Sequence, residues 1–181
     1  CRSSGRKSST AIRWNSCVAD GYPPIPEELP LQFRAAMRRL AASVAIVAAR
    51  GEHGPVGMAA TSVTSLTVDP PAVLICVNRA TVLHGLLVPT APLSVNLLSR
   101  HQQDVSAAFG GGTPQEERFR IGDWREGPGG VPELAGAQAN LACVIDAMLA
   151  YGTHSIVIAR VLSAQVSAEV APLIYQDGAY L

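Results

Sequence analysis

Short runs of apolar, often β-branched residues recur along this chain and are separated by stretches rich in Gly, Pro and Asn. Runs of about four to eight such residues between turn signals are typical of buried β-strands. The predicted strands cover residues 43–49, 56–62, 72–77, 92–98, 137–148, 155–165 and 173–175. About seven short strands with few helices predict a mainly β fold of the barrel class.

Three segments have helical spacing instead. In residues 27–40, Phe33, Met37 and Leu40 would share one face, with acidic residues at the start and arginines near the end, as the helix dipole favours. Residues 81–87 predict a short helix whose first N–H groups could face an anion. Residues 102–109 predict a third helix. The glycines at 110–112 would end it as a flexible connector, since no Lys follows them as in a phosphate loop.

The first part of the chain has a different character from the rest. Residues 1–26 mix Ser, Arg, Gly and Pro without a periodic apolar face, which predicts a mobile N-terminal arm. Residues 27–181 are long enough to form one domain with its own core.

The composition argues against several classes of partner. Lys plus Arg and Asp plus Glu both number 14, so the chain carries no net basic field, and nucleic acid is not expected to bind. The longest apolar run, within residues 40–49, is too short to cross a bilayer, so no membrane association is expected. The four cysteines have no C-x-x-C spacing, which predicts no metal site and a reducing, cytoplasmic location. Cys76 and Cys143 lie in apolar runs and are expected to be buried.

The most informative stretch covers residues 57–81. It begins with glycine and many small or hydroxyl residues, turns at Asp69-Pro70-Pro71, continues as an apolar strand and ends in Asn78-Arg79-Ala80-Thr81. Small side chains let a flat ligand approach the backbone, and hydroxyl and N–H groups can hold phosphate or carbonyl oxygens. The alternative is an ordinary Thr- and Ser-rich strand in a half-exposed sheet.

The order of these residues resembles the short-chain flavin reductase family. The pattern is Gly-x-x-Ala-Thr-Ser, then Ser-x-Thr-x-Asp-Pro-Pro, an apolar strand and Asn-Arg-Ala-Thr. The likeness continues at residues 93–98, 104–109, 152–156 and 172–175. The resemblance implies an FMN-binding split β-barrel that transfers hydride from NADH or NADPH to FAD or FMN. It also implies a homodimer that supplies reduced flavin to a partner monooxygenase.

The resemblance also implies roles for particular residues. Ala60, Thr61 and Ser62 would line the isoalloxazine edge, and Ser65 and Thr67 would follow the ribityl or phosphate side. The remaining implied flavin-binding residues are Asn78, Ala80, Thr81 and Asn96, with Arg79 or Arg100 pairing with phosphate. The family often has Thr where this chain has Ala59, which removes one expected hydrogen bond.

His154 is the catalytic candidate that the resemblance implies, because the family places this histidine where nicotinamide stacks on the flavin. A neutral imidazole could bind the carboxamide, and a protonated one could stabilise reduced flavin. From the residues alone, a structural cap on a hairpin is the favoured interpretation of His154.

Two other functions remain open at this point. The chain could be an FMN enzyme with its own organic substrate, whose pocket residues 113–133 would shape. It could also be a non-catalytic, dimeric flavin-binding protein.

Overall fold

The computed structural model describes residues 25–181, and most of the predicted arm, residues 1–26, lies outside them. The chain divides into two units, residues 1–37 and 38–181. In the first unit, the described element is helix α1 (Leu29–Met37), and all of its residues are exposed. This confirms the helix predicted over residues 27–40, with shorter bounds.

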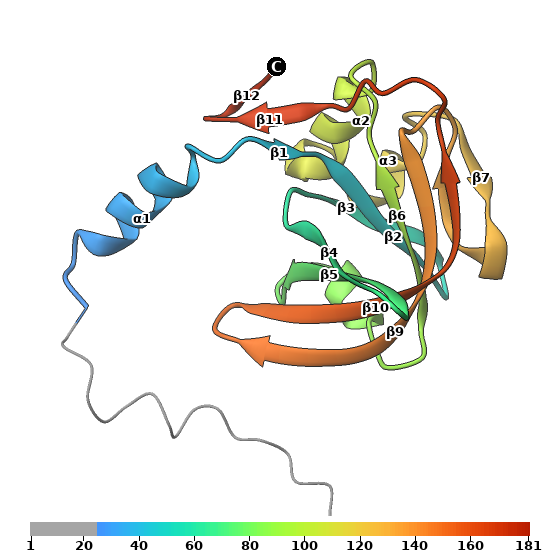
Figure 1. The fold of residues 1–181 in the computed structure, drawn as a ribbon, viewed down its shortest axis with the longest axis horizontal. Coiled ribbons are helices and arrows are strands. Elements are labelled where there is room, and N and C mark those ends of the chain that lie inside the picture. Colours follow the sequence, from blue (N-terminus) through green and yellow to red (C-terminus); the bar gives the residue numbers. More distant parts are fainter. Residues whose placement is uncertain (1–24) are drawn as a thin grey trace, which may run out of the picture. The chain divides into compact units, whose positions relative to one another are not determined.

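The second unit is built on one seven-stranded antiparallel sheet (Figure 1). In spatial order its strands are β3 (Gly54–Ala60), β2 (Ala45–Gly51), β6 (Pro92–Leu97), β9 (Ala139–Tyr151), β10 (His154–Val166), β5 (Pro71–Asn78) and β4 (Val63–Val68). The mainly β fold is therefore confirmed. The predictions did not include β4, and the Ser- and Thr-rich residues at 63–68 form a strand that is largely exposed.

All seven strands contribute side chains to one core, so the sheet is curled into a barrel. Its centre includes Val47, Ile75 and Val157, which have no exposed surface. A second core lies on the other side of β2, where Ile46 packs with residues such as Phe109. Successive side chains of a strand point to opposite faces. The continuous apolar run of β2 follows from this, because both of its faces are buried.

The helices after β6 cover the second core. They are α2 (Gln103–Ala107), the π-helical turn η3 (Ala108–Gly112) and α3 (Gln115–Arg118). The expectation that the three glycines end the helix is confirmed, because the backbone at Gly111 is not helical and the backbone at Thr113 is extended. Gly111 has φ 119°, a conformation that favours glycine. The helix predicted over residues 81–87 is the 3₁₀ turn η2 (Leu83–Leu86).

Smaller strands complete the unit. β1 (Ala42–Ser43), β11 (Ile174–Gln176) and β12 (Ala179–Tyr180) form a three-stranded sheet. The last predicted strand, residues 173–175, is thereby confirmed. Between α3 and β9 lie β7 (Trp124–Glu126), the turn η4 (Pro128–Gly130) and β8 (Pro132–Leu134).

The long β9–β10 hairpin turns at Gly152-Thr153. None of the helices within residues 25–181 is long and apolar enough to span a bilayer.

Candidate functional site

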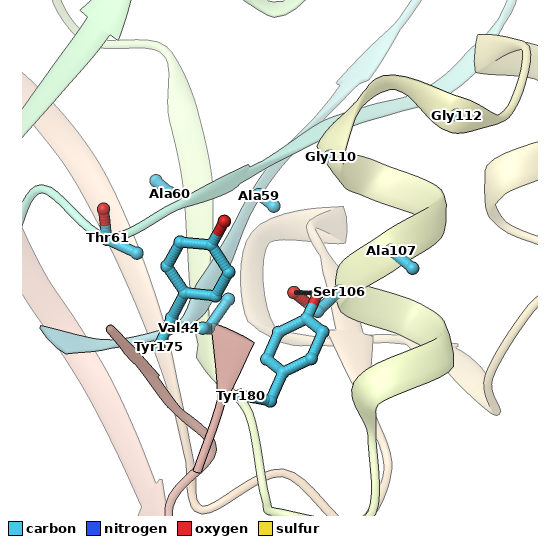
Figure 2. Close-up of a pocket in the computed structure, with 10 residues that line it drawn as sticks. All are labelled: Val44, Ala59, Ala60, Thr61, Ser106, Ala107, Gly110, Gly112, Tyr175 and Tyr180. Carbon is cyan, nitrogen blue, oxygen red and sulfur yellow. Dashed lines mark hydrogen bonds between the residues drawn. The ribbon is translucent and has the colours of Figure 1, made fainter. Parts of the chain in front are cut away.

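Two neighbouring pockets follow the second half of β3. The first has a volume of about 350 Å³ and lies between residues 59–61, helix α2, the glycine turn and the C-terminal strands. Figure 2 shows the rings of Tyr175 and Tyr180 inside it, beside Thr61 and Ser106. The hydroxyl of Tyr180 donates to Oγ of Ser106 over 2.9 Å, which fixes one ring. Tyr175 is 37% exposed, so an aromatic face is open to a ligand.

The second pocket has a volume of about 320 Å³ and adjoins the first. Residues 57–59 of β3 form one wall, residues 80–83 another, and Gln115 and Arg118 of α3 a third. Both pockets are lined by Ala59 and Gly110, so they are neighbours along the strand. Each volume lies within the range of about 300–1,000 Å³ that is usual for small-molecule sites.

Four of the predicted flavin-binding residues line these pockets. Ala60 and Thr61 line the first pocket, and Ala80 and Thr81 line the second. Local hydrogen bonds hold the second pair in place: the amide of Ala80 donates to Oδ1 of Asn78 over 2.9 Å, and Oγ1 of Thr81 donates to the carbonyl of Asn78 over 2.8 Å. Asn78 therefore shapes the turn on which Ala80 and Thr81 lie.

The predicted hydroxyls of Ser62, Ser65 and Thr67 line neither pocket. Oγ of Ser62 donates to the carbonyl of Cys76 over 3.0 Å and ties the connection between β3 and β4 to β5. Ser65 and Thr67 are exposed on the edge strand β4, and Oγ1 of Thr67 accepts from the amide of Asp69 at the Asp-Pro turn. In this conformation their hydrogen bonds serve the fold.

The predicted histidine lies beside Asn78. His154 is the first residue of β10 and pairs with Asn78 of β5 across the ladder. It is exposed, and its Nδ1 lies 2.9 Å from Oγ1 of Thr153. Arg79 is close by, because its Nη1 donates to the carbonyl of Gly152 in the same hairpin turn. The structure thus gathers His154, Asn78 and Arg79 at one end of β5, next to the pocket wall formed by residues 80–83.

The other two predicted residues lie elsewhere. Arg100 is exposed and forms an ion pair with Glu169 at 3.3 Å, and it lines neither pocket. Asn96 has no exposed surface. Its amide donates to the carbonyl of Ile46 and to Oγ of Ser94, and its Oδ1 accepts from the amide of Leu134. The bonds with Ile46 and Leu134 fasten β6 to β2 and β8, so Asn96 has a structural role in the fold.

Several lining residues were not predicted from the sequence. They are Gly57, Met58, Ser106, Gln115, Arg118, Tyr175 and Tyr180. Arg118 is held by three bonds of 3.0 Å, from Nε to the carbonyl of Thr113 and from Nη1 to the carbonyl of Gly57 and to Oε1 of Gln115. The sequence signal was weak, because residues 113–133 have little periodicity. Gly57, Ser106 and Tyr175 lie in segments of the family pattern, but the resemblance implied no role for them.

A second histidine and two cysteines lie away from the two pockets. Nε2 of His84 lies 2.9 Å from Oγ of Ser155, so this ring is packed against β10. Cys143 is buried as predicted, and burial raises the pKa of its thiol to about 12, whereas Cys76 is only partly buried. The Cys143 thiol is therefore protonated at neutral pH and has no chemical role there.

Comparison with known proteins places this site in a family. The family model described as "Flavin reductase like domain" matches residues 37–181. The chain is 41% identical over 157 residues to the reductase component of the FADH(2)-dependent resorcinol hydroxylase of Rhizobium sp., covering 86% of this chain and 88% of that protein. It is 37% identical over 152 residues to the FMN reductase (NADH) RutF of Pseudomonas syringae, covering 84% of this chain and 85% of that one.

A solved structure of a similar protein points to the same family. The NADH:FAD oxidoreductase SgcE6 of Streptomyces globisporus, in complex with NAD and FAD fragments, superimposes with a TM-score of 0.78 at 28% identity, covering 88% of this chain and 96% of that one. The sequence pattern, the curled sheet and these comparisons agree: the chain belongs to the flavin reductase like family.

Proposed function

We propose that this protein is an NAD(P)H:flavin oxidoreductase that passes reduced FMN or FAD to a separate flavin-dependent monooxygenase. The observation that carries the proposal is the pair of adjoining pockets along β3, one lined by tyrosine rings and the other by an arginine. A flavin nucleotide has the matching parts, a flat ring system and a phosphate-bearing chain. The Rhizobium relative, the reductase component of a hydroxylase, supports the role of a monooxygenase partner.

The residues present fit a flavin. Backbone at residues 59–61 is accessible beside small side chains, so the ring edge can approach it closely. When bound, the flavin supplies the chemistry, accepting hydride from the reduced nicotinamide. The protein then has to bind, orient and shield the two nucleotides, which accounts for a site without a buried acid–base pair among its lining residues.

The first pocket is open to solvent, which supports reversible binding of the flavin. Thr61 and Tyr175 are both exposed although they line the pocket. A resident cofactor is typically buried over most of its surface. We therefore infer that flavin is a substrate of this enzyme as much as a cofactor, with modest affinity and little discrimination between FMN and FAD.

His154 is proposed to face the nicotinamide. It lies at the end of β10 beside Asn78, and its ring is exposed, so it can reach a ligand that projects from the pockets. Its Nδ1 contact with Thr153 orients the imidazole and leaves Nε2 for the carboxamide.

A homodimer is part of the proposal. Large apolar side chains are exposed on β4 and β10, at Val68 (87%), Leu162 (67%) and Val166 (77%). Monomers seldom leave such a group uncovered. Light scattering is expected to give the mass of a dimer, and Leu162→Glu with Val166→Glu is expected to yield monomers. A flavin-binding monomer of the unaltered protein would contradict this.

The test of the proposed activity uses protein dialysed free of flavin. NADH and NADPH oxidation are measured with riboflavin, FMN or FAD added at increasing concentration. The proposal predicts negligible oxidation without flavin and saturable oxidation with it. A protein that keeps yellow flavin after dialysis and oxidises NADH only with an organic substrate would be an FMN enzyme of another kind. One that binds flavin without oxidising either nicotinamide would be a binding protein.

A further inference from the structure

Gln115 and Arg118 occupy one wall of the second pocket. We propose that these two side chains form the subsite that holds a phosphate ester of the nucleotide substrate. This deepens the proposed function and rests on it.

Arg118 is the one charged side chain among the described residues that line the two pockets. The adjacent Glu116 and Glu117 are exposed and do not line either pocket. The second pocket therefore combines a cationic wall with small side chains, without a carboxylate to repel an anion. Phosphate carries charge and several acceptor oxygens, and a guanidinium is well suited to binding it.

The guanidinium of Arg118 is already oriented by the protein. Its Nε and Nη1 atoms bind the carbonyls of Thr113 and Gly57 and Oε1 of Gln115, each over 3.0 Å. These three bonds involve Nε and Nη1 and leave Nη2 for a ligand. Because the side chain is held before binding, less rotamer entropy is lost when an anion arrives.

Gln115 supplies a second donor. Its Oε1 accepts from Arg118, so its Nε2 must point the other way, and this nitrogen is buried without a hydrogen-bond partner. A buried unpaired amide group costs about 1–3 kcal/mol. An acceptor oxygen in the pocket would remove that cost. The unpaired Nε2 and the free Nη2 belong to side chains that are bonded to each other, and both line the same pocket.

The other arginines near the site are less suited to this role. Arg100 is paired with Glu169, and Arg79 donates to the carbonyl of Gly152, and neither lines a pocket. The phosphate role that the sequence suggested for Arg79 or Arg100 is better filled by Arg118. Two substrates carry such a phosphate, the flavin nucleotide and the nicotinamide dinucleotide, and the experiment distinguishes them.

The test is the substitution Gln115→Glu, which keeps the size of the side chain and the oxygen that Arg118 binds. It replaces the free donor by a carboxylate oxygen. The Kd of FMN, measured by quenching of flavin fluorescence, is expected to rise about tenfold or more, since the carboxylate and the phosphate repel each other in a partly buried site. The Kd of riboflavin, which lacks the phosphate, is expected to stay within about twofold. Gln115→Leu removes the donor without adding charge and should give a smaller loss of the same selectivity.

The matched control is Gln103→Glu, the same chemical change at an exposed residue of α2 that lines neither pocket. It should leave both dissociation constants unchanged. Thermal unfolding of each variant reports whether the fold is intact.

Turnover measurements identify which substrate, the flavin or the nicotinamide nucleotide, carries the phosphate that binds to this subsite. With riboflavin as acceptor, the KM of NADH is compared with that of a benzyl dihydronicotinamide, which carries no phosphate. A Gln115→Glu effect confined to FMN assigns the subsite to the flavin, and an effect confined to NADH assigns it to the nicotinamide nucleotide. Equal effects on riboflavin and FMN, or no effect on any nucleotide, would overturn the proposal. The Kd measurements require no turnover. If Gln115→Glu weakened binding of FMN but not of riboflavin, and the protein did not oxidise NADH, the phosphate subsite would stand and the proposed activity alone would be refuted.

Discussion

Gly57 of β3 lies against the rings of Phe109 and Phe119, and a side chain at this position would have little space. A Cβ atom built on Gly57 would be 2.8 Å from Cε1 of Phe109 and 3.2 Å from Cζ of Phe119. The ring of Phe109 is only 2% exposed and packs against Phe119 and Trp124, with centroids 5.0 Å and 5.3 Å away. It therefore cannot swing into solvent to make room.

Gly57→Ala is thus expected to lower the free energy of unfolding. Overpacking a buried site costs about 1–3 kcal/mol. The smaller conformational freedom of Ala in the unfolded chain offsets about 0.4–1 kcal/mol of this. A net loss of about 1–2 kcal/mol corresponds to a Tm lower by about 2–8 °C for a chain of this size. The carbonyl of Gly57 also holds Arg118, so a shift of this strand is expected to weaken FMN binding.

Thermal unfolding followed by circular dichroism measures the effect. The control is Gly85→Ala in η2, where a Cβ meets nothing within 4 Å, and which should leave the Tm unchanged or slightly higher. If Gly57→Ala unfolded at or above the Tm of the wild-type protein, the close packing of β3 against Phe109 would be refuted.

Three further predictions concern single residues. Asn96→Ala should lower the free energy of unfolding by about 1–3 kcal/mol, because it leaves buried groups such as the Leu134 amide unpaired. The Kd of flavin should stay unchanged. Weaker flavin binding with unaltered stability would argue for a direct contact between Asn96 and the flavin. His154→Ala should lower kcat/KM for NADH about tenfold through one lost hydrogen bond, and unchanged kinetics would remove this residue from the mechanism. The folded state keeps the Cys143 thiol protonated until pH about 12, whereas the unfolded chain loses this proton above about 9.0, so stability should fall as pH rises between these values. The loss amounts to about 1.4 kcal/mol by about pH 10, and urea unfolding of Cys143→Ala should lack this part of the pH dependence.

The strands could be predicted where burial determines the residue pattern. Both faces of β2 are covered, and β5 lies inside the sheet, so their apolar runs could be recognised as strands from the sequence. β4 was not predicted because it is an edge strand with an exposed face. Its Ser and Thr residues give no apolar period, and it is pairing with β5 that makes it a strand.

The site was predictable only along the strands that the family pattern covers. Thr61 and Thr81 line the pockets as the resemblance led us to expect. Arg118 could not be found in this way, because its segment has no periodicity and its place is set by bonds to Gly57, which is 61 residues earlier in the chain. Asn96 shows the opposite case, a polar residue within a family motif whose hydrogen bonds are all used by the fold.

Anaerobic mixing of the protein with NADH and FMN tests the central claim most directly, because it follows hydride transfer to the flavin without reoxidation by oxygen. The account predicts that the flavin absorbance bleaches in a one-to-one ratio with NADH consumed, far faster with the protein than without it. It also predicts slower bleaching for Gln115→Glu at limiting FMN. If the protein left the rate of FMN reduction unchanged with both NADH and NADPH, it would not be a flavin reductase.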